Sequence, residues 1–279
     1  MRLAKLSGLL VLLFGMTGCI SSTTVVKVKP DGSGTIIQTT TMNSQMVAQM
    51  KQMVAEMAKS MGSTQSSESG DFFSEKEAIA NAAKMGEGVK YVSSEKIKTS
   101  EAEGIKATYA FTDVTKLRID EKPSTPGPAG AAMATPQSES GQTAFRFTKL
   151  ASGNSLLTVV IPQKKEAKEV STAKLNAPEQ SSADVAPEQL SQMKEIFKGM
   201  KISMAVEVEG RLVKTNGTYV NGPRVTLLEM DFGQLLSDEG KLRAMSKIKS
   251  MEEAREALKD LRGFKIELGP EVTIEFAGK

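Results

Sequence analysis

Hydrophobic and polar residues alternate along several stretches of this chain, as they do in strands that bury one face. The alternation is clearest in residues 105–111 and 202–208, where apolar side chains occupy every second position. In residues 24–41, two β-branched runs flank a segment with one proline, one aspartate and two glycines, so we expect a hairpin there. Such patterns predict strands at 89–98, 103–111, 145–147, 156–161, 225–232, 264–268 and 272–276.

Helical spacing is most regular between about Asn43 and Met61. Methionine recurs there at intervals of four, four, three, four and four residues, at Met42, Met46, Met50, Met53, Met57 and Met61. On a helix this spacing confines the six side chains to a stripe about 100° wide. Shorter helices are expected from the capping box at Ser74 to Gly86, from Pro187 to Gly199, and from the capping box at Ser250 to Gly263.

The methionine stripe allows three interpretations. It is the core face of a helix that packs on the hairpin's sheet, since methionine fills irregular apolar surfaces well. It is an adaptable apolar groove for a lipid or a partner helix, with Met46, Met50, Met53 and Met57 as the candidate ligand face. Alternatively, Met50 and Met53 offer thioethers to Cu(I), although neither histidine nor a free cysteine accompanies them.

Strands and helices alternate in clusters, without the steady β-α-β rhythm of a parallel sheet. The chain is therefore expected to be α+β, with antiparallel sheets packed with several helices. Residues 121–142 contain almost no bulky apolar side chain and are expected to form a disordered insertion; residues 163–186 are expected to be a flexible linker. The linker separates an N-terminal α+β region, 19–162, from a C-terminal α+β region, 187–279. The sequence leaves open whether the two regions share one core.

Residues 1–18 have the pattern of a signal peptide. Arg2 and Lys5 precede an apolar run, Leu9 to Phe14, which is too short to span a bilayer, and Met16-Thr17-Gly18-Cys19 follows. This block resembles the lipobox of bacterial lipoproteins. The resemblance implies cleavage before Cys19, a diacylglycerol thioether on its sulfur and acylation of the new N-terminus. Anchoring to the membrane through Cys19 would then be permanent, because two or three acyl chains exceed the threshold for reversible binding.

The residues after the lipobox cysteine bear on the membrane to which the protein is sent. Ile20 and Ser21 follow Cys19, and no aspartate stands beside it. In the best-known sorting pattern of bacterial lipoproteins, this resembles export to the inner leaflet of the outer membrane. The expected location is therefore the cell envelope, with the folded part facing the periplasm.

Composition narrows the chemistry that the chain can perform. Histidine and tryptophan are absent and Cys19 is the only cysteine, so the most frequent general base, zinc ligand and thiol nucleophile are missing. No P-loop, nucleophile elbow or dinucleotide-binding motif is present. Loss of Arg2 and Lys5 with the leader lowers the formal net charge from +3 to +1, which gives no electrostatic footprint for nucleic acid. We expect no catalysis, cofactor, metal or nucleic-acid partner.

One catalytic alternative stays open. Glu229 and Asp231 are two residues apart in an expected strand, so both point to one face and could pair for hydrolysis; Asp113 is a third candidate acid. The opposing interpretation is that these are ordinary solvated charges at strand ends.

Residues Val206–Gly217, followed by Gly222 and Val225, are similar to the strand–turn–strand pattern of mycobacterial LppM-type lipoprotein domains. The resemblance implies an α+β fold and an association with envelope glycolipids. Glu209-Gly210 stands where Pro-Gly is expected and no tryptophan follows the second strand, so no ligand residue is carried across. The expected function is that of a membrane-anchored lipoprotein with a non-catalytic binding or envelope-structural domain, whose partner is a protein or a lipid. A carrier of apolar lipid or glycolipid and a carboxylate-based hydrolase are the alternatives.

Overall fold

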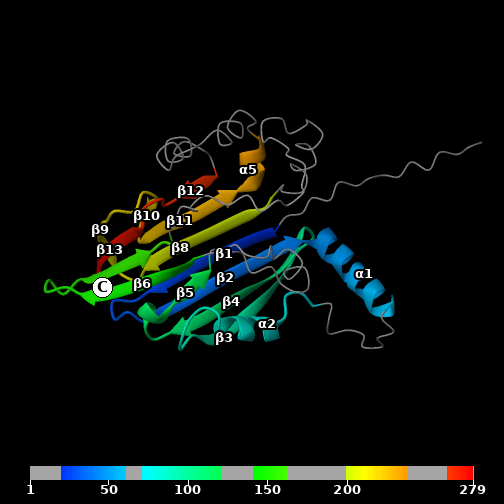
Figure 1. Ribbon diagram of the computed structural model, residues 1–279, viewed down its shortest axis with the longest axis horizontal. Coiled ribbons are helices and arrows are strands. Elements are labelled where there is room, and N and C mark those ends of the chain that lie inside the picture. Colours follow the sequence, from blue (N-terminus) through cyan, green and yellow to red (C-terminus); the bar gives the residue numbers. More distant parts are fainter. Residues whose placement is uncertain (1–19, 61–70, 121–140, 163–198, 238–262, 279) are drawn as a thin grey trace, which may run out of the picture.

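Two β-sheets form most of the structure, so the expected α+β class with several helices is wrong. The computed structural model describes residues 20–60, 71–120, 141–162, 199–237 and 263–278. Eight strands form a large sheet and five form a small sheet (Figure 1). Within these residues the α-helices are α1 (Ser44–Ser60), α2 (Glu75–Ala82) and α5 (Phe232–Ser237). The helices expected at 187–199 and 250–263 lie almost wholly outside the described residues.

The large sheet has the strand order β10-β11-β8-β1-β2-β4-β3, and β12 pairs with β11. Its antiparallel β1–β2 pair confirms the hairpin expected at 24–41. The pairing of β1 with β8 is parallel, so the sheet is mixed and not purely antiparallel. The strands are β1 (Ile20–Val28), β2 (Gly34–Asn43), β3 (Lys90–Lys98), β4 (Ala102–Phe111), β8 (Lys201–Val208), β10 (Val220–Asn221), β11 (Arg224–Asp231) and β12 (Phe264–Ile266).

The small sheet is antiparallel and has the order β5-β6-β7-β13-β9. It lies over the end of the large sheet that carries the β1–β2 turn, where the Ser155 hydroxyl donates to the Pro30 carbonyl at 2.8 Å (Figure 1). The strands are β5 (Arg118–Asp120), β6 (Gln142–Lys149), β7 (Ser155–Val160), β9 (Arg211–Thr215) and β13 (Glu271–Ala277).

The two halves of the chain share one core. β1 of the first half pairs with β8 of the second, and β7 pairs with β13. Residues 121–140 of the expected insertion and all of the expected linker, 163–186, lie outside the described residues, whereas Gln142 already belongs to β6.

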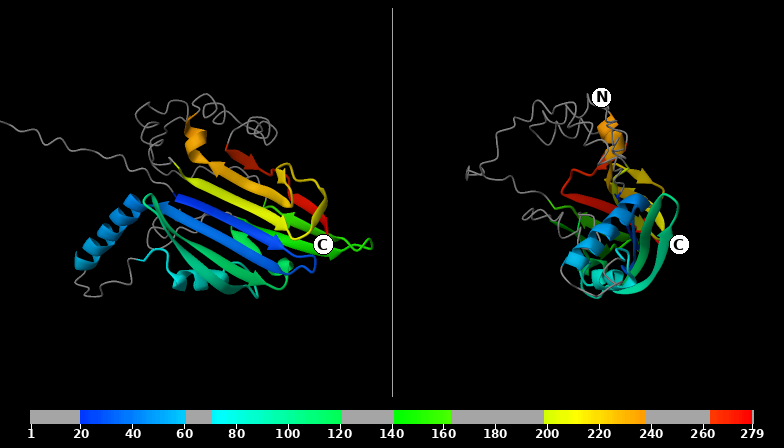
Figure 2. Two further views of the ribbon diagram at one scale, coloured as in Figure 1. Left: turned by 180° about the vertical axis from the view of Figure 1, so that it is seen from behind. Right: turned by 90° about the vertical axis from the view of Figure 1, so that its right-hand side faces the viewer.

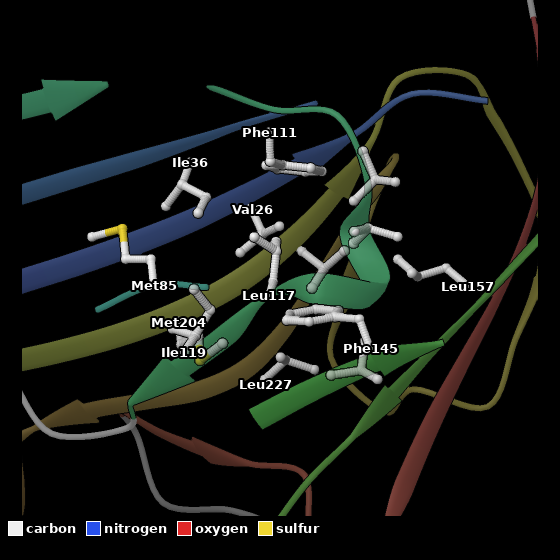
Figure 3. Packing of buried hydrophobic residues seen from close by; sticks show 14 of the residues in the cluster. Val26, Ile36, Met85, Phe111, Leu117, Ile119, Phe145, Leu157, Met204 and Leu227 are labelled. Atoms are coloured by element: carbon white, nitrogen blue, oxygen red, sulfur yellow. The ribbon is translucent and has the colours of Figure 1, made fainter. Parts of the chain in front are cut away.

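The main core lies between the two sheets, which explains why a layer of helices is not needed. In Figure 3, Leu117 lies between Val26 of the large sheet and Phe145 of the small one. The alternation along each strand gives each sheet one apolar face, and each of these faces is buried by the other sheet. The α2 segment adds Ala78, Ala82 and Met85 to this core. The sequence pattern located the strands, but helices were wrongly expected to cover them.

An ion-pair cluster joins the neighbouring strands β1, β8 and β11, which are distant from one another in the chain. Glu207 Oε1 lies 3.0 Å from Lys27 Nζ, and its Oε2 lies 2.6 Å from an Arg224 guanidinium nitrogen. Partial burial raises the pKa of the Glu207 carboxyl, but hydrogen bonds from Arg224 and Lys27 outweigh it and hold the pKa below its ordinary value.

Candidate functional site: the methionine helix beside the first strand

The first strand and the methionine helix begin at the same end of the large sheet. Ile20, the first residue of β1, pairs with Met42 near the end of β2, and α1 starts two residues later at Ser44. Figures 1 and 2 show α1 extending beyond this end of the sheet, away from the small sheet. Cys19 lies outside the described residues, and Ile20, which follows it in the sequence, is at the base of α1.

Polar contacts fix the direction in which α1 leaves the sheet. The Asn43 side chain accepts a hydrogen bond from the Gln45 backbone N–H at 2.9 Å, the arrangement of an N-cap. The Ser44 backbone N–H donates to the Glu101 carbonyl at 3.0 Å, and Lys51 Nζ lies 3.0 Å from Glu103 Oε2. These contacts join the first two turns of α1 to β4 and the loop before it. The helix confirms the one expected from about Asn43 to Met61.

A small second core lies between the start of α1 and the large sheet. Met42, Val47, Phe72 and Phe73 are buried in it and are at most 5% exposed. The side chains that are partly buried around it are Ile20, Met46, Met50, Val54 and Ile105. The apolar stripe of α1 is therefore packed at the sheet end of the helix, with phenylalanines from the segment before α2 filling the space.

The packing divides the stripe lengthwise. Val47 lies beside the methionines on the apolar face of α1. It is about 120° from Met53 around a helix of 3.6 residues per turn, so the two residues mark opposite edges of this face. Val47 is 1% exposed, whereas Met53 is 70% exposed. Met46 and Met50 lie between these edges and are half-buried. The Met57 side chain lies outside the described residues. Of the four candidate ligand residues, the structure thus brings Met46 and Met50 to the small core and leaves Met53 open.

Matched alanine substitutions at Met42, which is buried in the small core, and at Met53, on the open edge of α1, will compare a packed methionine with an exposed one. We expect Met42→Ala to lower the free energy of unfolding by about 2–4 kcal/mol, because it leaves a cavity in the small core. Met53→Ala should change the free energy of unfolding by less than about 0.5 kcal/mol, since this mostly exposed side chain loses little packing. Urea denaturation followed by circular dichroism measures both. Equal losses would contradict the burial of Met42 in the small core.

The carboxylates considered for catalysis have structural partners. Glu229 and Asp231 share one face of β11, as expected, opposite Ser203 and Lys201. Glu229 lies 3.3 Å from Lys265 Nζ and 3.9 Å from Lys201 Nζ. Asp231 Oδ1 accepts from the Gln234 backbone N–H at 3.1 Å, at the first turn of α5. These contacts join β11 to its neighbours and to the helix that follows it.

Asp113 also has a structural role, far along the chain from the other two acids. Its carboxylate accepts from the Thr115 hydroxyl at 2.7 Å and from the Thr115 backbone N–H at 2.9 Å, and so caps the short 3-10 turn Val114–Lys116. These hydrogen bonds hold the pKa of Asp113 below its ordinary value, so the group stays ionised.

Burial raises the pKa of the Tyr109 phenol to about 12, with a smaller contribution from Tyr91, so the phenol stays neutral.

The described part of the chain has neither a cluster of metal-binding side chains nor a helix that could cross a membrane. No three or more histidine, cysteine, aspartate or glutamate side chains are grouped there so that they could hold a metal ion. None of the helices there is both long enough and apolar enough to cross a bilayer.

Sequence reasoning missed the contribution of Phe72 and Phe73. Both directly precede the capping residue Ser74, whose hydroxyl accepts from the Glu77 backbone N–H at 3.2 Å. An apolar residue just before an N-cap often packs on the first turn of the helix, and this hydrophobic-staple signal could have marked Phe73 as buried. Nothing local to Phe72 indicates that it packs against α1.

Comparisons with known proteins leave the family open. No protein-family model matches the chain, and no curated protein matches it. Among solved structures, the NMR structure of the folded domain of the Mycobacterium tuberculosis LppM protein aligns with a TM-score of 0.31 and 7% sequence identity. The alignment covers 96% of this chain and 95% of that one. At this score the two proteins are not shown to share a fold, and the match carries no functional argument.

Proposed function

We propose that this chain is a lipid-anchored lipoprotein of the bacterial cell envelope, whose folded part binds or organises other envelope components without catalysis. The observation that carries the proposal is the lipobox Met16-Thr17-Gly18-Cys19, which stands directly before the first described strand. β1 starts at Ile20, directly after Cys19 of the lipobox, and lies between β2 and β8 in the large sheet. Every strand pairing described for the two sheets therefore uses residues that remain after cleavage before Cys19.

The sequence after Cys19 supports a location in the outer membrane. Ile20 and Ser21 follow the cysteine in place of an aspartate. With acyl chains on Cys19, the sheets would lie in the periplasm next to the lipid headgroups, because no linker separates Cys19 from β1.

A non-catalytic role is supported by the composition together with the contacts of the acids. The chain has no histidine, and its one cysteine is the proposed lipid attachment site. Asp113, Glu229 and Asp231 each accept a hydrogen bond or form an ion pair that stabilises a turn, a strand pairing or a helix end. A lipid carrier that used the groove of Met46 and Met50 would have to displace Phe72 and Phe73, which already pack there.

Mass spectrometry of the mature protein tests the anchor directly. Protein extracted from membranes should begin at Cys19 and carry a diacylglyceryl group on sulfur with a further acyl chain on the terminal nitrogen. The N-terminal peptide should therefore be much heavier than its sequence predicts and should partition into detergent. Gradient separation of inner and outer membranes then locates the protein.

The matched control is Cys19→Ala, which lacks the sulfur that must be alkylated and should show no lipid on its N-terminal peptide. An inhibitor of the lipoprotein signal peptidase should cause the uncut wild-type precursor to accumulate. A free thiol at Cys19 in protein from the native host, or a leader that stays attached without the inhibitor, would contradict the proposal.

A further inference from the structure

We propose that α1 lies in the membrane interface, with its open methionine edge in contact with the acyl chains of the same bilayer that holds the lipid anchor. The inference rests on the proposed lipidation of Cys19. It goes beyond anchoring because it assigns a second, non-covalent contact between the folded part and the membrane, and it fixes which end of the sheets faces the lipid.

The first step is the distance between the anchor and the helix. Consecutive Cα atoms are about 3.8 Å apart and paired strands about 4.8 Å, so Ile20, the covalent neighbour of Cys19, lies on the order of 10 Å from the start of α1. Ile20 pairs with Met42, and Met42 itself is buried at the base of the helix. An acyl chain on Cys19 therefore brings the base of α1 to the membrane surface.

The second step is the direction of α1. The helix does not fold back over either sheet but extends beyond the end at which β1 begins (Figures 1 and 2). Its capped start and the Lys51–Glu103 ion pair hold it in this direction. At about 1.5 Å per residue it is roughly 25 Å long, enough to lie along the lipid surface beside the anchor.

The third step is the chemistry of the open edge. Met53 is 70% exposed, the most exposed of the large apolar side chains in the described residues, and the half-buried Met46 and Met50 lie beside it on the stripe. The other side of the helix presents exposed polar residues, among them Gln45, Lys51 and Gln52. An apolar edge next to a polar face is the arrangement of a helix that lies in the interface plane.

The occupant is the hydrocarbon of the bilayer, not its anionic headgroups. The exposed charges between Ser44 and Glu56 are Lys51 and Glu56, and Lys51 is paired with Glu103. With no excess of positive charge, attraction to acidic lipids contributes little, and the contact should be insensitive to salt. The covalent anchor makes up for the narrow apolar edge by keeping the helix at a high effective concentration beside the lipid.

Lipid quenching of a label at position 53 tests the inference. Once the Cys19 sulfur is alkylated, a thiol introduced by Met53→Cys is the only free one and accepts a bimane label. Acylated protein is reconstituted in vesicles of phosphatidylethanolamine and phosphatidylglycerol, with or without lipids brominated on their acyl chains. We expect brominated lipid to quench the label several-fold more strongly at position 53 than at position 55 in the matched variant Ala55→Cys, at low and at high salt, because the exposed Ala55 lies about 160° from Met53 around the helix.

The outcomes distinguish the inference from the proposed function. Intact mass is measured first, and an unmodified Cys19 would overturn the proposed anchoring. Acylated protein whose labels at 53 and 55 are quenched equally by brominated lipid would overturn only the membrane contact of α1. A label at 53 that is shielded from aqueous iodide yet not quenched by brominated lipid would also overturn it, because the helix would then be covered by protein.

Discussion

Alanine in place of Gly34 is expected to destabilise the fold by at least about 3 kcal/mol, among the largest effects of a single methyl group. Gly34 opens β2 and pairs with Val28 on one side and Phe111 on the other. A Cβ at this position would lie 1.9 Å from the Lys27 carbonyl oxygen and 2.7 Å from Phe111 Cζ. The oxygen belongs to the neighbouring strand, so it cannot move away without disturbing the β1–β2 pairing.

Gly269→Ala is the matched control for this substitution. The nearest atom to a Cβ at position 269 is the Glu271 carbonyl oxygen at 3.8 Å, an ordinary contact. Its free energy of unfolding should stay within about 0.5 kcal/mol of the wild-type value. Urea denaturation followed by circular dichroism gives both values. If Gly34→Ala unfolded at the same urea concentration as the control, the close approach of β1 to β2 would be refuted.

Ile36→Ala should lower the free energy of unfolding by about 3–4 kcal/mol. Ile36 lies in β2 between Val26 of β1 and Tyr109 of β4, and all three side chains are 0% exposed. Truncation leaves a cavity between the two sheets, and neighbours in paired strands can relax into it only partly. The loss should be visible as an earlier thermal midpoint and an earlier urea midpoint.

Ile79→Ala provides the comparison within the same residue type. Ile79 lies on α2 and is 52% exposed, so truncation removes little packing. Alanine also has the higher helix propensity, and the variant should be as stable as the wild type or slightly more so. A loss at Ile79 as large as that at Ile36 would contradict the position of the core between the sheets.

Local patterns predicted the strands well because alternation is a local property. The expected strand at 103–111 is β4, Ala102–Phe111, and the one at 202–208 is β8, Lys201–Val208. The strand expected at 264–268 ends at Ile266. Glu267, 7% exposed, instead accepts hydrogen bonds from the backbone of Thr218 and Tyr219. That contact joins segments distant in the chain, and no local pattern indicates it.

The fold class was wrong because it depends on how distant elements cover one another. Alternation shows that each strand has an apolar face but not whether a helix or a second sheet buries it. The same applies to the candidate site. The spacing of the methionines predicted the helix. Which methionine is buried depends on where Phe72 and Phe73 pack, and these two residues belong to another segment: Met42 is buried with them, whereas Met53 is exposed.

The parallel pairing of β1 with β8 has a consequence for how the protein is made. Ser21 pairs with Lys201, so the first strand cannot complete its hydrogen bonds until most of the polypeptide has been translocated. Contacts this distant in sequence form slowly, and in the meantime β1 has an unsatisfied edge that can pair with another chain. Under the proposed anchoring, the unpaired edge of β1 would stay beside the membrane lipid until β8 is available to pair with it. Export chaperones should therefore be needed most in the interval between the appearance of the β1–β2 hairpin and the arrival of β8.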